Sequence, residues 1–505
     1  MARLPAQAPY ANAHDRDAVG IAAVGIVMAL GRTSAGYGRT GRAGASRGFG
    51  WDMMVDRRAF IAGSVALAAA GRLAAEPVVA DDWAGRDAIL ARIRAPLFPA
   101  ARFPITAYGA KEESPAHVAV QAAVDACAAA GGGRVVIPDG LWRMNGPVHL
   151  RSNVELHLES DATLRFGTPD EIDLPMVLTR WEGVEVYNYS PLIYARGCSN
   201  VAITGDGTID GQGKQGFFKW RAKQDADKAL LRQMGATGVP VEQRRFGPGH
   251  FLRPAFVQFL DCRNVLIDGP RFEDSPFWTI HPVYSRNVTV RNVTIVSKHL
   301  NSDGVDPDSC EDVLIERCRI HVSDDCVAIK SGRDQDGWRV ARPTRNVVIR
   351  DCEMSTLIAG AVAIGSEMSG GTSNVFVERI HVKRAKQALY VKANLDRGGV
   401  VQQVRVRDLK VTMCETLVDF TTAYHGGARG KSPPTYKTFA VERVGCGSAD
   451  RVLRIVGVPQ APVEDVLIRN IAVSKATAPD VIAHTRGLRL EQIWVGGDGL
   501  ATRAR

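Results

Sequence analysis

The chain has 505 residues, 45% of them hydrophobic, which is enough for a large core and typical of a soluble globular protein. Fifty glycines suit a fold with many turns, and the net charge of +9 describes a mildly basic protein that suits a polyanionic partner. The sequence has no basic run and no nucleic-acid motif, so we expect no nucleic-acid partner.

A pair of arginines near the N-terminus precedes a weakly apolar stretch. Arg57 and Arg58 are followed by Phe60 and by an Ala-rich segment over 62–70, and small residues near Ala75 would allow cleavage. This pattern resembles a twin-arginine export signal, whose substrates are exported already folded. A chance Arg-Arg pair before an Ala-rich helix is the alternative. We expect a periplasmic or secreted protein with no membrane span in its mature form.

This interpretation divides the chain into four parts. They are an over-extended translation start without periodicity (1–52), a signal peptide (53–75), a linker (76–102) and one catalytic domain (103–495).

Nine cysteines are an odd number, so at least one is unpaired within the chain. Cys318 and Cys352 occupy a repeat position that is Val or Ile elsewhere, which predicts buried apolar residues rather than disulfides. No CxxC pair or Cys/His cluster indicates zinc, and we expect no metal and no cofactor.

A short amphipathic helix is predicted from Ala116 to Ala130, ended by three glycines at 131–133. Its expected apolar face carries Val118, Ala122, Val124 and Ala128. Because strands follow at once, we expect this helix to cover the N-terminal edge of a sheet.

A repeated strand pattern is the strongest architectural signal. An Asn or Asp opens each repeat, apolar residues follow at +1 and +3, and a second apolar pair stands at +6 and +8. The repeats begin at Asn264, Asn287, Asp312, Asn346, Asn374 and Asp465. Period-two alternation points these side chains to one side, and periods of this size are typical of a solenoid. The Leu spacing is wrong for leucine-rich repeats and β-branched residues dominate, so we predict an all-β, right-handed parallel β-helix.

Two charged stretches, 212–255 and 331–345, break the period. Loops that leave a solenoid commonly border a cleft on one face, so we expect these two to do so.

Three carboxylates lie on two consecutive repeats. Asp303 stands in Asn-Ser-Asp-Gly, and Asp324 and Asp325 follow 21 and 22 residues later. Stacked coils would bring them to one wall, as general acid/base hydrolysis of a glycosidic bond requires. Calcium binding or a solvated loop are the alternatives. Adjacent residues on a straight strand face opposite sides, so Asp324 and Asp325 reach one cleft only if the strand bends or ends there.

With these motifs, residues 103–475 resemble glycoside hydrolase family 28, the polygalacturonase family. The resemblance rests on the segments 106–110 (TAYGA), 131–138 (GGGRVVIP), 207–211 (GTIDG), 301–304 (NSDG) and 324–325 (DD). It implies an inverting hydrolase of pectin-type polysaccharide, galacturonan or rhamnogalacturonan. Asp324 would protonate the leaving oxygen, and Asp303 and Asp325 would activate water.

The sequence departs from the family pattern at two places. The family histidine before Ile-Gly-Ser is Gly360 here, and the arginine of Arg-Ile-Lys is Tyr390, although Lys392 is kept. An imidazole would tune a neighbouring carboxyl, and a guanidinium pairs bidentately with a carboxylate. These departures therefore leave the tuning of an Asp and the binding of galacturonate open. The segment 365–371 is similar to exo-acting bacterial members.

Further substrate contacts are expected from six residues. Arg397 and Arg333 would replace the missing arginine, and Lys392 would bind a uronate carboxylate. The other three are Asn301, which would orient the aspartates, and Trp278 and His281, which would face a sugar or be structural.

Three functions therefore compete on sequence grounds. The first is an exo-acting hydrolase that acts as a monomer on acidic plant cell-wall polysaccharide. The second is a β-helix lyase or epimerase, and the third is a non-catalytic carbohydrate-binding solenoid. The pairing of Asn-Ser-Asp-Gly with Asp-Asp one coil later favours the hydrolase.

Overall fold

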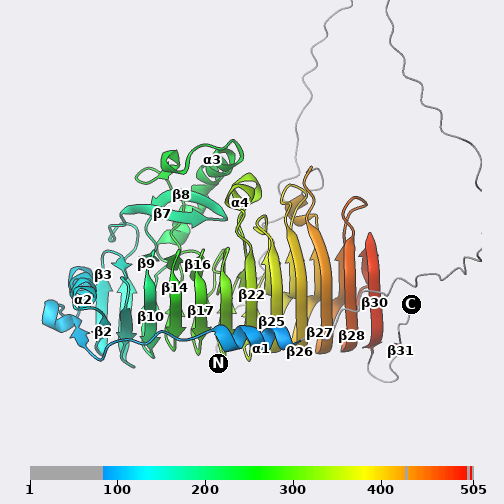
Figure 1. Cartoon of the computed structure of the whole chain (residues 1–505), viewed down its shortest axis with the longest axis horizontal. Helices are drawn as coiled ribbons and strands as arrows, with labels where there is room; N and C mark the ends of the chain where they lie inside the picture. The colour runs from blue at the N-terminus through cyan, green and yellow to red at the C-terminus, as the bar shows by residue number, and fades with distance from the viewer. Residues whose placement is uncertain (1–82, 427–429, 497–500, 503–505) are drawn as a thin grey trace, which may run out of the picture. The chain divides into compact units, whose positions relative to one another are not determined.

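The computed structural model describes residues 83–426, 430–496, 501 and 502. Within them the chain forms a right-handed parallel β-helix whose coils stack along one axis (Figure 1). The predicted fold is confirmed. The expected translation start and signal peptide lie outside the described residues.

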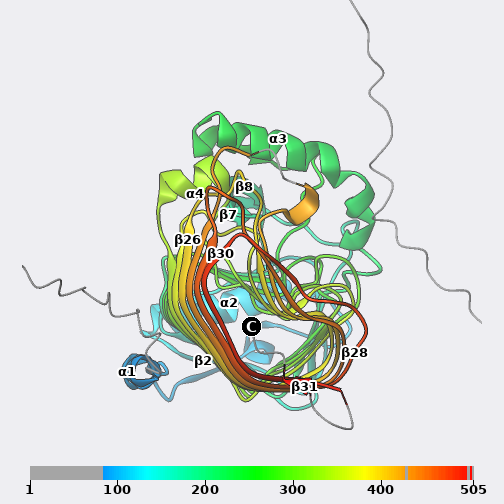
Figure 2. The same cartoon turned by 90° about the vertical axis from the view of Figure 1, so that its right-hand side faces the viewer.

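Viewed along the axis, the stacked coils outline a closed cross-section with several faces (Figure 2). The first face contains β1 (Arg102–Pro104), β2 (Gly133–Ile137), β5 (Val154–Leu158), β10 (Ser199–Gly205), β14 (Arg263–Asp268), β17 (Arg286–Arg291), β19 (Glu311–Glu316) and β22 (Thr344–Arg350). The second face contains β3 (Gly140–Met144), β6 (Ala162–Phe166), β11 (Thr208–Asp210), β15 (Arg271–Glu273), β18 (Thr294–Ser297), β20 (Arg319–Val322) and β23 (Glu353–Thr356).

The third face, which we call the site sheet, contains β4 (Val148–His149), β9 (Ile193–Arg196), β13 (Val257–Leu260), β16 (Ile280–Val283), β21 (Val327–Ile329) and β24 (Gly360–Gly365). Parallel bridges at Val305 and Asp308 join β16 to the coil of β21. Later coils are formed by long bent strands: β25 (Thr372–Lys392), β26 (Val400–Thr421), β27 (Thr435–Val456), β28 (Val463–Ala476) and β30 (Thr485–Val495). β29 (Val481–Ala483) pairs with β27, and β31 (Ala501–Thr502) pairs antiparallel with β30.

The repeat opens with Asn or Asp because that position has left-handed backbone geometry. Asn264, Asn287, Asn346 and Asn374 have φ between 55° and 61°. Asn tolerates this region better than most residues. The side chains also stack, since the amide of Asn287 donates to Asn264 at 2.8 Å. The turn and the ladder together set the register of successive coils.

The apolar repeat positions form the interior of the helix. Val293, Ile295, Cys318 and Ile320 are buried in one continuous core. All nine cysteines lie in the described part of the chain, and each is a buried free thiol. The prediction for Cys318 and Cys352 is confirmed.

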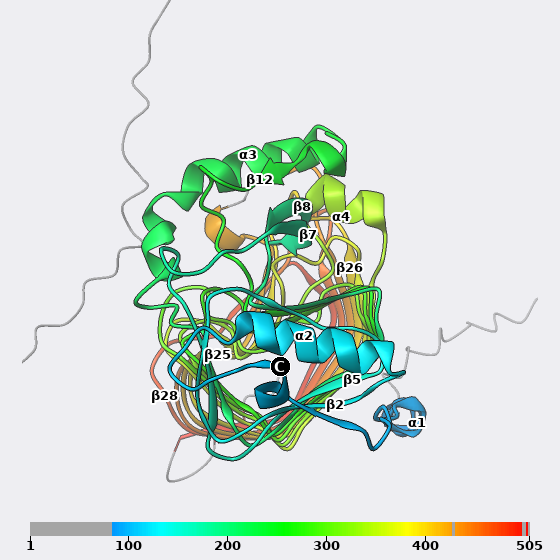
Figure 3. The same ribbon diagram turned by 90° about the vertical axis from the view of Figure 1, so that its left-hand side faces the viewer.

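The predicted N-terminal helix is α2 (His117–Ala129), which covers the open end of the first coils (Figure 3). Its apolar face was predicted wrongly in part. Val118 is 69% exposed, and the buried face carries Val120, Ala123, Val124 and Cys127 instead. These four have the i, i+3, i+4, i+7 spacing of one helical face.

The expected linker contains α1 (Ala84–Arg92), which lies along the outside of the first face (Figure 1). Trp83 and Ile89 pack on Val348 and Phe376, and Arg86 forms an ion pair of 2.7 Å with Glu378. From Trp83 onward this segment is therefore held on the solenoid.

Four segments cover the outer side of the site sheet, and we call them the roof (Figures 1 and 2). They are the antiparallel hairpin β7 (Met176–Trp181) and β8 (Val184–Tyr189), helix α3 (Gln224–Ala236) and helix α4 (Asp334–Val340). β12 (Arg245–Phe246) extends the hairpin. Both predicted loop stretches contribute to the roof, whereas the hairpin was not anticipated.

Candidate active site

The three acids lie in turns at one end of the site-sheet strands. β20 ends at Val322 and β21 begins at Val327, so Asp324 and Asp325 occupy the bend between them. The amide of Gly304 donates to the carbonyl of Asp325 at 2.9 Å, which stacks the Asp303 turn on this bend. The predicted break in the strand is confirmed. A Cβ at Gly304 would lie 2.4 Å from the carbonyl oxygen of Cys326, so only glycine fits.

One carboxylate oxygen from each of Asp303, Asp324 and Asp325 lies within 4.8 Å of the others. Burial, followed by the neighbouring Asp325, raises the pKa of Asp324. Burial, followed by Asp324 and Asp306, raises the pKa of Asp303 well above its usual range. The cluster therefore favours protonated forms of two of its members, and a protonated carboxyl can act as a general acid.

Asp325 is held differently from the other two acids. Its Oδ2 accepts a hydrogen bond of 2.6 Å from Lys392 Nζ, and its Oδ1 accepts one of 2.8 Å from the amide of Gly360. Although burial opposes the charge, Asp325 raises the pKa of Lys392 well above its usual range. A carboxylate paired with a buried ammonium is placed to accept a proton.

Gly360, which replaces the family histidine, lies directly beside Asp325. A Cβ there would be 3.1 Å from Cβ of Tyr390 and 3.2 Å from Oδ1 of Asp325. The side chain of Tyr390, the other departure, therefore occupies space beside this position. The backbone N–H of Gly360 is therefore the group that contacts Asp325 from this position. Lys392 also faces the rings of Tyr390 and Tyr424, at 4.9 and 5.0 Å from their centroids.

A fourth carboxylate, Asp306, was missed. It is completely buried, and within the described part of the chain neither of its oxygens accepts a hydrogen bond. Lys330 Nζ lies 3.6 Å from Asp306 and 3.9 Å from Asp303. It also lies 3.2 Å from Glu367 Oε2. The alternation of Asp306 and Asp308 along an extended strand could have indicated that both point outward.

Glu367, also missed, links Lys330 to one predicted substrate contact, Arg333, and lies next to Ser366, which binds the other, Arg397. Although burial opposes ionisation, Lys330 and Arg333 hold the pKa of Glu367 well below its usual range. Arg333 donates to Glu367 at 2.5 Å. Arg397 is buried, where it donates to the carbonyl of Ser366 at 2.6 Å and pairs with Asp334. In this structure both arginines therefore make their hydrogen bonds to other groups of the protein.

Asn301 borders the acids, as expected. Its backbone N–H donates to Asp324 Oδ2 at 3.1 Å. Lys392 also borders the acids, but its nearest anion is Asp325, so a substrate carboxylate would have to share it.

The two predicted sugar-facing residues lie beneath the surface. Trp278 is 3% exposed and stacks on Phe277, and Lys330 Nζ lies 4.1 Å from its ring centroid. His281 is completely buried, with its ring hydrogen-bonded to Gln258 at 3.0 Å and Asp308 at 3.5 Å. Neither side chain lines an open surface here.

The β7–β8 hairpin lies over the site sheet and contacts the coil that carries Asp303 as well as an earlier coil. Arg180 forms a fully buried ion pair of 2.8 Å with Asp308, and Thr179 donates to Gln258 at 2.6 Å. At the hairpin tip, the carbonyl of Glu182 accepts from Arg333 at 3.1 Å. The outward side chains of Gln258 and Asp308 are thereby removed from solvent.

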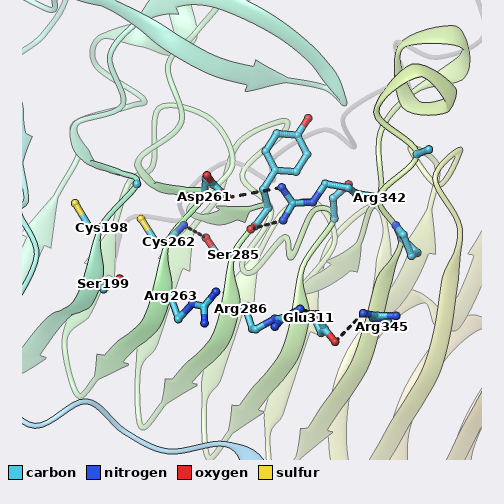
Figure 4. Close-up of a pocket in the computed structure, with 15 residues that line it drawn as sticks. Cys198, Ser199, Asp261, Cys262, Arg263, Ser285, Arg286, Glu311, Arg342 and Arg345 are labelled. Atoms are coloured by element: carbon cyan, nitrogen blue, oxygen red, sulfur yellow. Dashed lines mark hydrogen bonds and ion pairs between the residues drawn. The ribbon is translucent and has the colours of Figure 1, made fainter.

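A separate cavity of about 510 Å³ lies at the opposite end of the short site-sheet strands (Figure 4). Its arginines are largely paired. Arg345 lies 2.9 Å from Glu311, and Arg342 lies 3.7 Å from Asp261. The three acids do not line it, so this cavity is not the candidate active site.

A divalent cation is the other species that the three acids could hold, because carboxylate oxygens are hard ligands. Lys330 and Lys392 already place two positive charges beside the cluster. This favours acid/base use of the cluster over cation binding.

Comparison with known proteins points the same way. Residues 127–484 match the family described as "Glycosyl hydrolases family 28". The sequence is 29% identical over 372 residues to a probable polygalacturonase of Vitis vinifera, covering 70% of each chain. It is 26% identical over 298 residues to an endo-polygalacturonase of Pectobacterium carotovorum, covering 56% of this chain and 65% of that one.

Solved structures are also similar. An exopolygalacturonase from Thermotoga maritima matches with a TM-score of 0.78 and 35% identity, over 83% of this chain and 99% of that one. The polygalacturonase of Erwinia carotovora has a TM-score of 0.61 and 22% identity, over 79% of this chain and 98% of that one, and supports the fold. Among the described residues, no helix is long and apolar enough to cross a membrane.

Proposed function

This chain belongs to glycoside hydrolase family 28, and from that premise we propose that it is an exo-acting, inverting enzyme that removes uronate units from galacturonan chains. The general reaction of this enzyme is hydrolysis of glycosidic bonds in pectin-type polysaccharide. The observation that carries the proposal is the division of one acid cluster into a raised-pKa carboxyl, Asp324, and an ion-paired carboxylate, Asp325.

In the proposed mechanism, Asp324 gives its proton to the leaving glycosidic oxygen. Asp325, held by Lys392 and Gly360, accepts a proton from the attacking water. Asp303 lies beside both, and its raised pKa favours its protonated form, in which it can donate a hydrogen bond to water. No covalent sugar intermediate is involved, so the anomeric centre inverts.

The β7–β8 hairpin supports exo action. The Arg180–Asp308 pair fills the outer side of the site sheet within the coil that also carries Asp303. A polymer that reaches the acids would then end there instead of passing through. The similar exopolygalacturonase agrees with this proposal.

The test is product analysis with purified protein on polygalacturonate, oligogalacturonides and rhamnogalacturonan, with and without a chelator. Early release of one short product from galacturonan supports the proposal. A rise in absorbance of unsaturated product would favour a lyase. A lack of any product across the panel would favour a binding solenoid, and chelator sensitivity would favour a cation at the acids.

Export by a twin-arginine signal is a separate proposal, supported by Arg57, Arg58 and the apolar stretch that follows. It implies cleavage near Ala75 and an exported domain that includes residues 103–495. Replacing both arginines by lysine in a bacterial host should abolish export. Unchanged export would refute the signal.

A further inference from the structure

Arg253 is a completely buried guanidinium that joins the roof to the catalytic turn. It stands just before β13, at the end of the charged stretch 212–255. The indole N–H of Trp181, at the end of β7, donates to its carbonyl at 3.0 Å. Arg253 therefore belongs to the roof through its backbone and reaches toward the acids with its side chain.

The side chain contacts both α3 and the loop that precedes Asp303. Nε donates to Gln224 Oε1 at 2.9 Å, at the first residue of α3. Nη2 donates to Asn301 Oδ1 at 2.6 Å, and Nη1 donates to the carbonyl of Leu300 at 3.2 Å. A further carbonyl, that of Pro276, accepts from Nη1 at 3.3 Å.

Asn301 continues this path to the catalytic acid. Its side chain is fixed by Arg253, and its amide donates to Asp324 Oδ2. The contacts run from Gln224 through Arg253 and Asn301 to Asp324. Helix α3 is thus tied to the group that delivers the proton.

The charge of Arg253 has no counter-ion at contact distance. All its hydrogen-bond acceptors are neutral oxygens, and no carboxylate of the described chain lies within 4.0 Å of it. The rings of Phe277 and Phe218 lie 5.0 and 5.9 Å from the guanidinium carbon. Burial, followed by the nearby Arg221, lowers the pKa of Arg253 to about 9. A buried cation that no carboxylate contacts is costly, and the carboxylates that offset this cost from a distance are Glu182, Asp324 and Asp303.

We propose that Arg253 is a positioning residue for the general acid. Through Asn301 it holds the amide that contacts Asp324, and its charge favours the ionised form that Asp324 adopts after giving up its proton. The inference rests on the proposed role of Asp324. Because the amide and the charge act on the product of proton transfer, they lower the free energy of that step.

Other charged groups act on Asp324 at the same time. Asp325 and Asp303 disfavour its ionised form, and Lys392 and Lys330 favour it. Tyr424 faces the cluster from the loop after β26. Arg253 also interacts electrostatically with Glu182 at the hairpin tip and with Arg221, which precedes α3. Arg253 is thus a cation on the roof side of the cluster, whereas Lys330 directly follows β21 and Lys392 ends β25.

The test measures how kcat/KM on oligogalacturonide depends on pH for the wild type and three variants. Arg253→Met removes both charge and hydrogen bonds, Arg253→Gln removes the charge but keeps a donor, and Arg253→Lys keeps the charge. Arg221→Met is the matched control, because it removes one charge from the same stretch, where Arg221 pairs with Asp225.

Loss of a nearby positive charge should raise the pKa of the acid. The alkaline limb of kcat/KM should therefore move upward, by on the order of one pH unit, in Arg253→Met and Arg253→Gln. Arg253→Lys should keep the limb near its wild-type place while kcat falls about tenfold because Asn301 is held less firmly. Arg221→Met should leave the alkaline limb and kcat unchanged.

A lower kcat with an unmoved limb in the neutral variants would overturn the inference and leave a structural role. If Arg253→Met fails to fold by circular dichroism, Arg253→Gln decides the outcome. A wild type without turnover on any pectic substrate would refute the proposed function itself. An active wild type with unmoved limbs would refute only this inference.

Discussion

Lys392 Nζ lies 2.6 Å from Asp325 Oδ2, and both side chains are almost completely buried. The sequence had suggested Lys392 as the anchor for a substrate carboxylate. In the structure it is first the partner of Asp325, the proposed base. Changes at Lys392 should therefore act on catalysis as well as on substrate binding.

Lys392→Met should lower kcat strongly on both uronate and carboxyl-reduced substrates. The variant leaves Asp325 buried without its cation, and breaking a buried pair costs about 3–5 kcal/mol. Thermal unfolding should show the loss of stability, and Lys392→Arg should recover part of both effects. A variant that raises only KM, and only for uronate substrates, would restore the role of carboxylate anchor.

Asp324→Asn should abolish hydrolysis with little effect on folding. An amide cannot protonate the leaving oxygen, and general acid assistance contributes roughly 10²–10⁴-fold in rate. Turnover of oligogalacturonide and circular dichroism check the two parts. Near-wild-type turnover in a folded variant would reject the assignment of Asp324.

Asp303→Asn should stabilise the protein at neutral pH. The folded-state pKa of Asp303 is raised, so the folded state binds this proton more tightly than the unfolded state. Wild-type stability must then fall as pH rises from the unfolded pKa, 3.8, through the raised folded value. Asp303→Asn has no carboxyl to ionise, so its stability does not fall with pH for this reason. Its Tm should exceed that of the wild type at pH 7 and approach it near pH 4.

Asp351→Asn is the matched control with the opposite sign. A hydrogen bond from Arg379 lowers the pKa of Asp351, so this acid stabilises the fold above its unfolded pKa and loses that effect as pH falls. The variant should melt earlier than the wild type at pH 7. Equal shifts for both variants would mean that the charge state of Asp303 has no special effect.

Shortening the β7–β8 hairpin should convert end-wise release into internal cleavage. The variant replaces residues 180–185 with two glycines and carries Asp308→Asn, which avoids an unpaired buried carboxylate. Viscosity of polygalacturonate should then fall faster for each reducing end formed. Asp308→Asn with the hairpin intact is the control. An unchanged product pattern in the shortened variant would show that the hairpin does not set exo action.

Hydrolysis should invert the anomeric configuration. Inverting sites separate the two carboxyls by about 6.5–9.5 Å, so that water fits between them. One oxygen from each of the three acids lies within 4.8 Å of the others, which is closer than that rule prefers. NMR of the first-formed product decides between the outcomes, and retention would require one aspartate to attack the sugar.

The sequence by itself determined the solenoid and the position of the acids. Asn264 and its equivalents predict the turn because left-handed geometry and side-chain stacking favour that residue type. Apolar positions such as Val293 and Ile295 predict which side chains face the interior, because successive side chains of a β-strand point to opposite faces. Both signals are local and repeat in every coil. Asp303, Asp324 and Asp325 were found because one repeat returns the chain to the same wall.

Only the tertiary structure decided which charged groups surround the acids and where the hairpin meets the site sheet. Lys392 reaches Asp325 across 67 residues, and Arg180 reaches Asp308 across 128. Arg253, Asp306 and Glu367 owe their roles to burial beside groups distant in sequence. Even the buried face of α2 differed from the predicted one, since the first coils select which residues they cover. Local patterns encode backbone geometry, but the charge state of a buried group depends on neighbours that folding brings together.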